Sequence, residues 1–300
     1  MKKQLSSPIK YLTVNEDDIN WGLTVTTVGY QSVLPDSRYP SKDHPSRYWF
    51  HPDTGRILQE YQLIYITRGQ GHFSGGALKN VPVGEGTILL LFPNEWHSYQ
   101  PAIATGWDTY WVGFKGGVAD QLIRHHFFDK QTPLHAIGFN EQLLDLFKQV
   151  IALAREERAG FQQAISGIAM HMLGAVYFIT KNSQFQDKEI VTKIEKARLL
   201  MREYPDGTIP PEELAARLNM GYSWFRRMFK QYTGLSPTQY QQQIRLQQAK
   251  DLLVSSGKTI KEIAYELNFE SANYFTAFFK QKAGFTPAVF RKRSHQPVMK

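Results

Sequence analysis

The stretch IAYELNFESANYFTAFFKQKAGFTPAVFRKR, residues 263–293, decides the fold of the carboxyl-terminal part of the chain. It contains six phenylalanines and two tyrosines, and it ends in a run of basic residues. A similar stretch, LAARLNMGYSWFRRMFKQYTGLSPTQY at residues 214–240, lies about fifty residues upstream. Such a composition fits either a small aromatic core with a solvated surface or a surface that lies on an anionic partner.

The two stretches are copies of one sequence unit. Asn219 matches Asn268 at an offset of 49, and after the gain of one residue Gly234 matches Gly284 at an offset of 50. Chance does not produce agreement of this extent, so the unit is duplicated. The other matched pairs are Ala215 with Ala264, Leu218 with Leu267, Phe225 with Phe275, Phe229 with Phe279, Lys230 with Lys280 and Pro237 with Pro287.

Each unit predicts a helix, a tight turn and a second helix. In the first unit, two prolines and two acidic residues begin the first helix, and Gly234 follows the second helix as a carboxyl-terminal cap. Phe225, Met228, Phe229 and Tyr232 fall on one face of that second helix. A helix-turn-helix with a cationic free face is suited to the major groove of DNA. The alternative, a small bundle with a solvated charged face, is disfavoured by the duplication.

The free faces of the second helices supply candidate DNA contacts. Arginine binds guanine and asparagine binds adenine in a bidentate manner. The candidates for base contacts are Ser223, Arg226 and Arg227 in the first unit and Asn273 and Thr276 in the second. The candidates for phosphate contacts are Lys230, Lys280, Arg291 and Arg293. Because Ala277 stands where the first unit has Arg227, we expect the second unit to discriminate less between DNA sequences.

The segment between the units supports this geometry. Residues 237–256 predict one helix of about 18 residues, or about 27 Å, compared with ~34 Å between successive major-groove entries on one face of DNA. One chain could therefore place two helices in successive groove segments. Within the second unit, we expect the aromatic side chains to form the core. They are Phe269, Phe275, Phe279 and Phe285.

Length, charge and composition predict two domains with different tasks. The 300 residues exceed what one core usually serves. Residues 1–185 carry 16 basic and 16 acidic side chains, whereas residues 186–300 carry 19 basic and 11 acidic, so 19 − 11 gives the whole net charge of +8. A basic back half indicates a polyanionic partner.

The absence of cysteine excludes disulfides, thiol catalysis and cysteine-ligated zinc, and it fits a reducing compartment. The first twenty residues lack an apolar segment, and no apolar run reaches about 18 residues. We therefore expect a soluble, cytoplasmic protein that does not associate with a membrane.

From Tyr61 to Phe114, short apolar runs alternate with turn residues, which predicts an antiparallel sandwich or barrel. Gly69 and Gly71 predict a hairpin-like bend around Gln70. Aromatic and polar side chains gather on two of the predicted strands and would suit a sugar, which presents C–H faces to indole rings and hydroxyls to polar groups. These side chains are Trp96, His97, Tyr99, Trp107, Tyr110 and Trp111. The alternative is that they fill the interior of the barrel.

The alternative of a metalloenzyme is disfavoured by the histidine pattern. Small barrels of this kind often bind iron or manganese through several imidazole and carboxylate ligands. Here His72 is followed by Phe73 and Ser74, so a His-x-His pair is missing. His97 has no second histidine near it in the sequence. His125 and His126 are adjacent, so they point to different sides of a helix and cannot both bind one metal. We therefore expect no metal, no cofactor and no enzymatic activity.

Between residues 140 and 179 the apolar period changes to about 3.6, which predicts two helices. They could pack on the barrel, face a second copy of the chain, or do both. The polar segment 180–189 predicts the domain boundary. We divide the chain into an effector-binding domain (1–139), a helical support or dimerisation segment (140–182), a linker (183–187) and a DNA-binding domain (188–300) whose helix-turn-helix units cover about 210–234 and 259–284.

The residues IKEIAYELNFESANYFTAFFKQKAGFTPAVFRKR, preceded by RLQQAKDLL, resemble the double helix-turn-helix domain of the AraC/XylS family of transcription regulators. Asn268 stands where that family usually has glycine, and asparagine also tolerates a left-handed conformation. The segment RGQG…VGEGTILLLFPNEWHSY…WDTYWVGF is similar to the cupin-type effector domain of the family. The resemblance implies that Arg68, Tyr99 and Trp111 contact a sugar and that Thr109 replaces a histidine contact.

The resemblance also implies a homodimer and an amino-terminal arm that responds to ligand. Together these observations predict a two-domain α+β protein: a cupin-like antiparallel β-barrel with helices, then an all-α double helix-turn-helix domain. The predicted function is that of a cytoplasmic, DNA-binding transcription regulator, either an activator or a repressor, that senses a sugar. RNA polymerase is a candidate partner. The alternatives are a cupin-type metalloenzyme and a nonspecific architectural DNA-binding protein.

Overall fold

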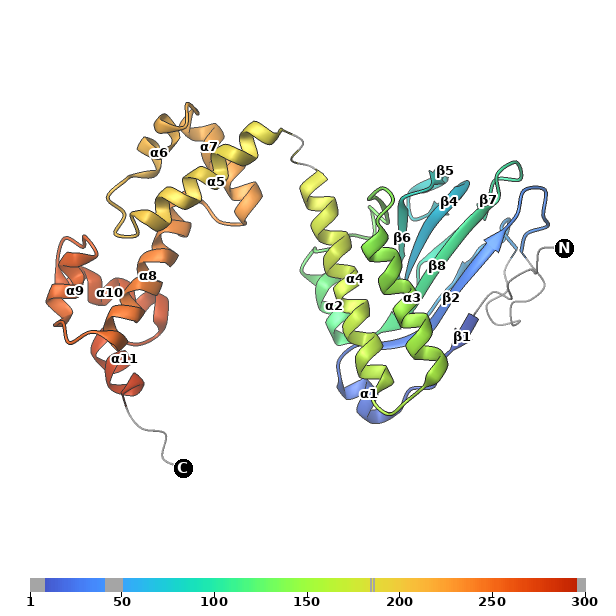
Figure 1. The fold of residues 1–300 in the computed structure, drawn as a ribbon, viewed down its shortest axis with the longest axis horizontal. Helices are drawn as coiled ribbons and strands as arrows, with labels where there is room; N and C mark the ends of the chain where they lie inside the picture. Colours follow the sequence, from blue (N-terminus) through green and yellow to red (C-terminus); the bar gives the residue numbers. More distant parts are fainter. Residues whose placement is uncertain (1–8, 41–50, 184, 186, 296–300) are drawn as a thin grey trace. The chain divides into compact units, whose positions relative to one another are not determined.

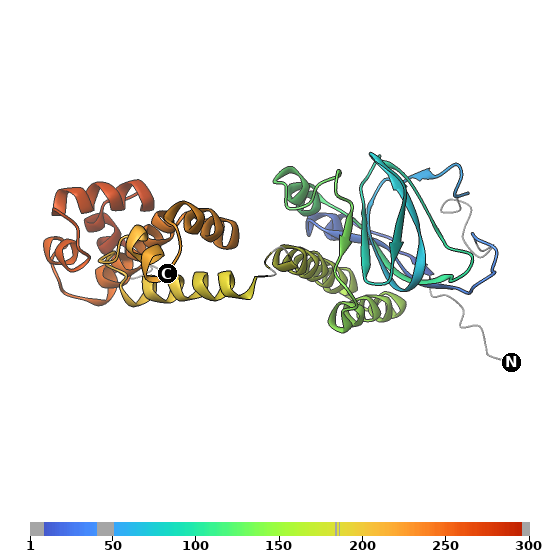
Figure 2. The same cartoon turned by 90° about the horizontal axis from the view of Figure 1, so that it is seen from above.

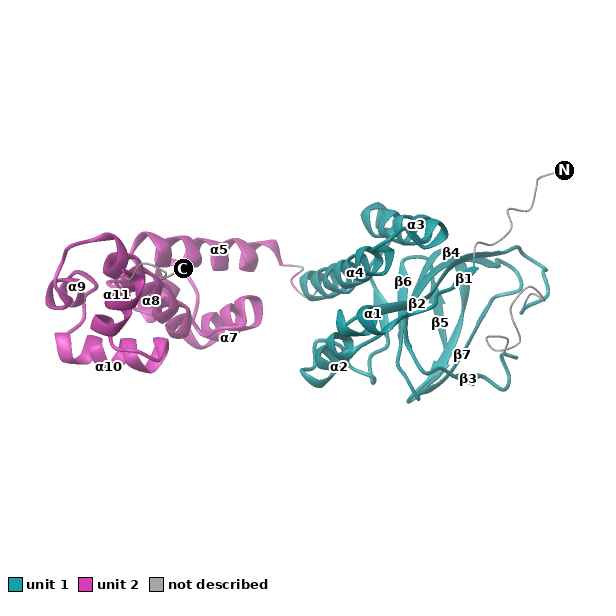
Figure 3. Ribbon diagram, turned by 90° about the horizontal axis from the view of Figure 1, so that it is seen from below, with its two compact units in different colours: residues 1–184 teal, residues 185–300 magenta. Residues whose placement is uncertain are grey.

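The computed structural model describes residues 9–40, 51–183, 185 and 187–295 (Figure 1). The chain folds as two compact units, residues 1–184 and 185–300 (Figure 3). The first is an antiparallel β unit with helices and the second is entirely helical, so the predicted two-domain α+β fold is confirmed. The predicted arm lies partly outside the described residues, because residues 1–8 are not among them.

The amino-terminal unit contains nine strands in the described part of the chain. They are β1 Ile9–Tyr11, β2 Thr24–Val33, β3 Arg56–Ile57, β4 Tyr61–Gly75, β5 Leu78–Gly84, β6 Thr87–Leu91, β7 Trp96–Pro101, β8 Trp107–Lys115 and β9 Leu134–Ala136. The strand order is β1-β2-β8-β4-β6-β9, while β3 pairs with β7 and both β5 and β7 pair with β4. The long β4 therefore belongs to both halves of the sheet system.

The expected hairpin at Gln70 is wrong, because β4 runs without a break from Tyr61 to Gly75. The register shifts between Ile66 and Arg68, and Gly69 has a φ of 84°. A bulge and a positive φ bend a strand without ending it. The first part of β4 therefore pairs with β6 and β8, and the second part pairs with β5 and β7.

The described residues of this unit also form four helices: α1 Glu16–Asn20, α2 Gly117–Arg124, α3 Glu141–Glu156 and α4 Phe161–Ser183. The predicted apolar stripes of α3 and α4 pack on the sheet, where Phe147 and Met172 are fully buried. By length and composition alone, α4 is the one helix among the described residues that could cross a membrane, with 33% of the relevant window buried. Its contribution to the core accounts for its apolar composition.

A second apolar cluster fills the space between the two halves of the sheet system. It includes Ile64, Phe73 and Trp107, and Tyr99 and Trp111 pack against it. In Figure 2 the strands curve around this interior, and the yellow-green helices α3 and α4 lie outside it. Side chains alternate between the two faces of a strand. On β8, Trp107, Thr109 and Trp111 therefore face the interior.

The carboxyl-terminal unit consists of seven helices in its described residues. They are α5 Lys188–Glu203, α6 Pro211–Arg217, α7 Tyr222–Thr233, α8 Pro237–Ser255, α9 Ile260–Glu266, α10 Ala272–Ala283 and α11 Pro287–Ser294. Asn219 and Asn268 have φ values of 52° and 57° in the two turns. The prediction that Asn268 can adopt the left-handed conformation is confirmed. The helix α8 is continuous, as the sequence predicts.

Candidate functional site

In the first helix-turn-helix, α6 and α7 expose the polar face that the sequence predicts. Phe225 and Phe229 of α7 are fully buried in the core with α5 and α6. The four candidate DNA contacts on α7 are all exposed: Ser223, Arg226, Arg227 and Lys230. Gly234, with a φ of 80°, ends the helix. Packing of the aromatic stripe thus leaves the cationic face free to reach another molecule.

One residue of this face was missed by the sequence reasoning. Trp224 is 41% exposed, and the guanidinium carbon of Arg227 lies 4.4 Å from the centre of its ring. Cation–π contact of this kind restricts where the guanidinium points. The sequence contained a signal for this contact, since residues three apart on a helix are neighbours.

The second helix-turn-helix presents fewer free polar groups. Asn273 and Lys280 of α10 are exposed. Thr276 is only partly exposed, and its hydroxyl donates a hydrogen bond of 2.8 Å to the carbonyl of Ala272 one turn earlier. A hydroxyl with an internal acceptor is less suited to a base contact. The position of Thr276 therefore leaves Asn273 as the stronger base-contact candidate of this helix.

At the carboxyl-terminal end, the expected phosphate contact by Arg291 does not fit the structure. Its Nε donates to the carbonyl of Leu253 at 3.0 Å, and its Nη2 is buried. Arg291 thus caps the end of α8, whose last carbonyls lack helical partners.

Arg293 is exposed, and its guanidinium lies 4.0 Å from the centre of the Phe285 ring. Phe285 is 40% exposed, so the expectation that it belongs to the core is wrong.

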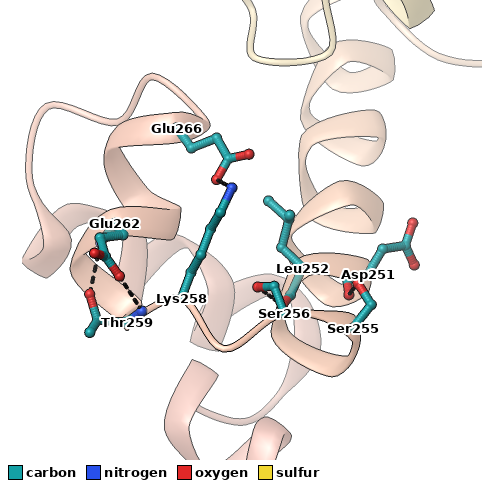
Figure 4. Close-up of polar contacts among 8 residues, drawn as sticks. All are labelled: Asp251, Leu252, Ser255, Ser256, Lys258, Thr259, Glu262 and Glu266. Atoms are coloured by element: carbon teal, nitrogen blue, oxygen red, sulfur yellow. Dashed lines mark hydrogen bonds and ion pairs between the residues drawn. The ribbon is translucent and has the colours of Figure 1, made fainter.

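The end of α8 and the start of α9 form a compact polar junction (Figure 4). The hydroxyl of Ser256 donates to the carbonyl of Leu252 at 2.6 Å. Thr259 and Glu262 form a capping box at the start of α9. The hydrogen bond from the Thr259 backbone lowers the pKa of the Glu262 carboxyl. These contacts define where the second helix-turn-helix begins.

In the amino-terminal unit, Arg56, His97 and Tyr99 form a polar cluster at the interior. The Nη2 of Arg56 donates to the Tyr99 hydroxyl at 2.6 Å, and its Nε donates to Nε2 of His97 at 3.3 Å. Burial, assisted by the charge of Arg56, lowers the pKa of His97 to about 3. The imidazole is therefore neutral, with Nε2 accepting and Nδ1 donating to the carbonyl of Glu95 at 3.2 Å.

Indole rings line the adjoining part of the interior. Trp107 is 2% exposed and stacks at an angle with Tyr99, with ring centres 6.1 Å apart. Its Nε1 is buried and has no acceptor within hydrogen-bonding distance among the described residues. Trp111 lies over Gly29, because a Cβ there would be 2.2 Å from the indole ring. Thr109 is buried on the same face of β8.

His97 and Tyr99 stack with ring centres 6.2 Å apart, and Thr109 and Trp111 share the inner face of β8, but Arg68 lies elsewhere. Both Nε and Nη2 of Arg68 contact the carboxylate of Asp108, at 2.9 and 3.2 Å, and the side chain is 62% exposed. Asp108 shares its face of β8 with Tyr110, which packs against Phe147 of α3. Arg68 therefore lies on the outer face of the sheet. Arg56 places a cation beside His97 and Tyr99 instead, and the sequence reasoning missed it.

The interior offers hydrogen-bond donors, a neutral imidazole, a hydroxyl and aromatic faces. Among the described residues, no group of three histidine, aspartate or glutamate side chains is arranged to hold a metal ion. Hydrogen bonding and stacking are interactions that these side chains can provide.

Family models match both parts of the chain. A model described as an AraC-like ligand binding domain matches residues 42–173, and a model described as a helix-turn-helix domain matches residues 214–293. The chain is 36% identical over 240 residues to YidL, an uncharacterized HTH-type transcriptional regulator of Escherichia coli, covering 80% of this chain and 78% of that protein.

Two further relatives extend over most of the chain. The MmsAB operon regulatory protein of Pseudomonas aeruginosa is 27% identical over 271 residues, covering 88% of this chain and 87% of that protein. The transcriptional activator RhaS of Klebsiella pneumoniae is 22% identical over 280 residues, covering 89% of this chain and 93% of that protein.

A ligand-binding β unit joined to a double helix-turn-helix unit defines a transcription regulator with a DNA-binding and a ligand-binding part. The chain belongs to the AraC family of these regulators. It is therefore not an enzyme, and membership of this family overturns the alternative of a cupin-type metalloenzyme.

Proposed function

We propose that the chain is a cytoplasmic regulator that binds a specific DNA sequence through both helix-turn-helix units and responds to a sugar bound inside its β unit. The DNA-binding part of the proposal is supported above all by the exposed cationic face of α7. There, Arg226 and Arg227 project from a helix whose opposite face is buried. Lys280 and Arg293 extend the positive charge to the second unit.

The sugar is supported by the interior cluster. Arg56, the Tyr99 hydroxyl and the neutral imidazole of His97 can exchange hydrogen bonds with hydroxyl groups. The indoles of Trp107 and Trp111 offer faces for C–H groups, and Trp107 Nε1 is a buried donor without a protein acceptor among the described residues. A buried donor of this kind is costly unless a ligand or water accepts its hydrogen bond.

The test of sugar binding is a thermal-shift screen of the full-length protein with a panel of neutral monosaccharides, oligosaccharides and sugar acids. We expect one neutral sugar to raise the melting temperature. The response should disappear in Trp107→Phe, which keeps an aromatic ring and removes the Nε1 donor, and it should remain in the control Arg68→Ala. A response from sugar acids alone would contradict the proposal of a neutral sugar.

The test of DNA binding is selection of sequences from random duplex DNA by the purified protein, with and without the sugar found in the screen. We expect a motif with two half-sites, one for each helix-turn-helix unit. Equal binding to selected and random DNA would instead favour the nonspecific architectural protein.

We also propose that the regulator is a homodimer that uses a face of α4. Met170 is 39% and Phe178 is 66% exposed on this helix, and Gly167 and Gly174 have open space beside them. These residues recur at intervals of three and four, so they share one side of α4. Sedimentation equilibrium should show a dimer that Phe178→Glu weakens. A monomeric wild-type chain would contradict the proposal.

Regulation of transcription by activation is the further part of the proposal. It is supported by RhaS, a relative that is named a transcriptional activator. An activator would make RNA polymerase a partner. Transcription in vitro from a promoter that carries the selected motif should increase on addition of the protein, and a decrease would show a repressor.

A further inference from the structure

The two helix-turn-helix units have separate hydrophobic cores. The core of the first contains Phe225 and Phe229, and Ile244 of α8 packs at its edge. The core of the second contains Phe275 and Phe279, with Leu246 of α8 at its edge. The two cores therefore meet along α8, and Arg245 lies at the point where they meet.

Arg245 contacts the turn of the second helix-turn-helix. Its Nη2 donates to the carbonyls of Leu267 and Asn268, at 2.7 and 3.0 Å. Its guanidinium carbon lies 3.9 Å from the centre of the Phe269 ring. The planar guanidinium combines these hydrogen bonds with stacking, which lysine cannot do. The turn is thus held to the middle of α8 by polar and aromatic contacts together.

Arg245 also adjoins the segment that precedes the first helix-turn-helix. A Cβ at Gly207 would lie 3.4 Å from Cδ of Arg245, so the backbone of Gly207 lies against the arginine stem. Burial lowers the pKa of Arg245, and the charge of Asp206 opposes that change. One side chain therefore touches the turn of the second helix-turn-helix and the segment that leads into the first.

The first unit lacks this arrangement. Ile194, Ala197 and Met201 of α5 correspond in spacing to Leu246, Ala249 and Leu253 of α8, at an offset of 52, and each set packs in the core of its own unit. This offset places Lys193 where α8 has Arg245. Lys193 pairs with Glu189 at 2.7 Å. The groove that it lines beside Leu218 and Asn219 is open, with a volume of about 430 Å³.

We propose that Arg245 is a positioning residue that sets the angle between the two helix-turn-helix units and thereby the separation of α7 and α10. The consequence for DNA rests on the proposed function, because only a protein that reads two half-sites needs a fixed separation. The separation itself is a property of the free protein and can be measured without DNA.

Because the chain has no cysteine, single labels can be placed at will. Gln231 and Gln281 are exposed at equivalent positions of α7 and α10, so spin labels on Gln231→Cys and Gln281→Cys report the separation of the two helices. The full-length protein is measured by pulsed dipolar spectroscopy. In Arg245→Met, which keeps an apolar stem and removes the donors, we expect the distance distribution to broaden and its maximum to shift.

The matched control is Arg291→Met. Arg291 also donates to a backbone carbonyl of the carboxyl-terminal unit, at Leu253, but this hydrogen bond joins α11 to the end of α8, away from the first helix-turn-helix. Its distribution should match that of the wild-type protein. Arg245→Lys, which keeps the charge, should also broaden the distribution and serves if the methionine variant fails to fold. An unchanged distribution in a folded Arg245 variant, or equal broadening in Arg291→Met, would overturn the proposal.

DNA selection separates this inference from the proposed function. Wild-type protein that selects no motif contradicts the proposed function, while the distance measurement still decides the role of Arg245. Where wild-type protein selects half-sites at one spacing, Arg245→Met should accept an inserted base pair with a smaller loss of affinity. A variant that keeps the wild-type spacing preference contradicts the inference.

Discussion

The guanidinium carbon of Arg227 lies 4.4 Å from the centre of the Trp224 ring, on the exposed face of α7. The contact with the ring restricts the conformations that the Arg227 side chain adopts on the exposed face of α7. An arginine that is held in position before it binds loses less side-chain entropy when it does. The pair therefore forms a preorganised element of the proposed DNA-binding surface.

Trp224→Ala should weaken binding to the selected DNA by about 0.5–1 kcal/mol, the strength of an exposed cation–π contact. Trp224→Phe should lose less because it retains an aromatic face. Dissociation constants from fluorescence anisotropy on selected and random DNA would measure the effect. Equal affinity of Trp224→Ala and wild-type protein for the selected site would show that the contact has no role in binding.

Arg226→Ala should weaken binding to the selected sequence by about 1–3 kcal/mol and relax specificity at one base pair. Arg226 is exposed on the same helix face as Arg227 and has the length to bind a guanine edge. Repetition of the DNA selection with the variant would identify the base pair. If the variant weakens binding to selected and random DNA equally, Arg226 contacts phosphate instead.

Lys230→Ala and Lys280→Ala should each weaken binding to all DNA sequences alike. In a plot of the logarithm of the binding constant against the logarithm of salt concentration, each variant should reduce the magnitude of the slope by about one. Both lysines are exposed at equivalent positions of α7 and α10. Lys79→Ala, in the amino-terminal unit, is the control and should leave the slope unchanged. A change of sequence preference in either variant would argue for a base contact.

Gly29→Ala should impair the sugar response without impairing DNA binding. The added Cβ would lie 2.2 Å from the Trp111 indole, so the ring must leave its position at the interior. The control is Gly117→Ala, since no atom lies within 4 Å of the position of its Cβ. Thermal-shift titration with the sugar found in the screen would compare the two variants.

Trp111→Ala should likewise abolish the response to the sugar. A normal response in both Gly29→Ala and Trp111→Ala would exclude this site.

Acid should destabilise the amino-terminal unit in part through His97. Its pKa in the folded chain is about 3, below the ordinary value of 6.5, so the unfolded chain binds more protons between these values. The contribution of His97 to the free energy of unfolding should therefore rise as the pH increases from about 3 to 6.5 and stay constant at higher pH. Its full size is about 1.4 kcal/mol for each unit by which the pKa is lowered. Above pH 6.5 this contribution is fully present.

His97→Gln should flatten that dependence. Urea unfolding followed by tryptophan fluorescence reports mainly on this unit, because five of the six tryptophans lie in residues 1–184. His51→Gln, an exposed histidine, is the control. The same slope in His97→Gln and wild-type protein between pH 4 and pH 6 would contradict the expected role of His97.

The helical unit was largely predictable because its signals are local. The stripe containing Phe225 and Phe229, the capping by Gly234 and the turn at Asn268 all depend on residues within a few positions of one another. Hydrophobic periodicity and capping act over this same range. Because the unit is duplicated, the same pattern in both copies supports the same predicted helices and turn.

The interior of the β unit was less predictable because strand pairing joins distant residues. Arg68 was expected at the sugar site, yet the bulge between Ile66 and Arg68 changes which face it occupies. A shift of one residue reverses the facing of a strand. Arg56 reaches the interior only because β3 pairs with β7, where it lies opposite His97.

The amino-acid sequence by itself determined the family, the helix-turn-helix duplication and the exposed cations of α7, since these follow from local periodicity and from similarity along the chain. Only the tertiary structure decided which arginines are exposed for contact with DNA and which bind backbone carbonyls within the protein. Arg291 caps a carbonyl 38 residues away, and Arg245 holds the turn at Leu267 and Asn268 to α8. A charged side chain has the same identity in either role, and its function depends on which buried acceptors the fold brings within reach.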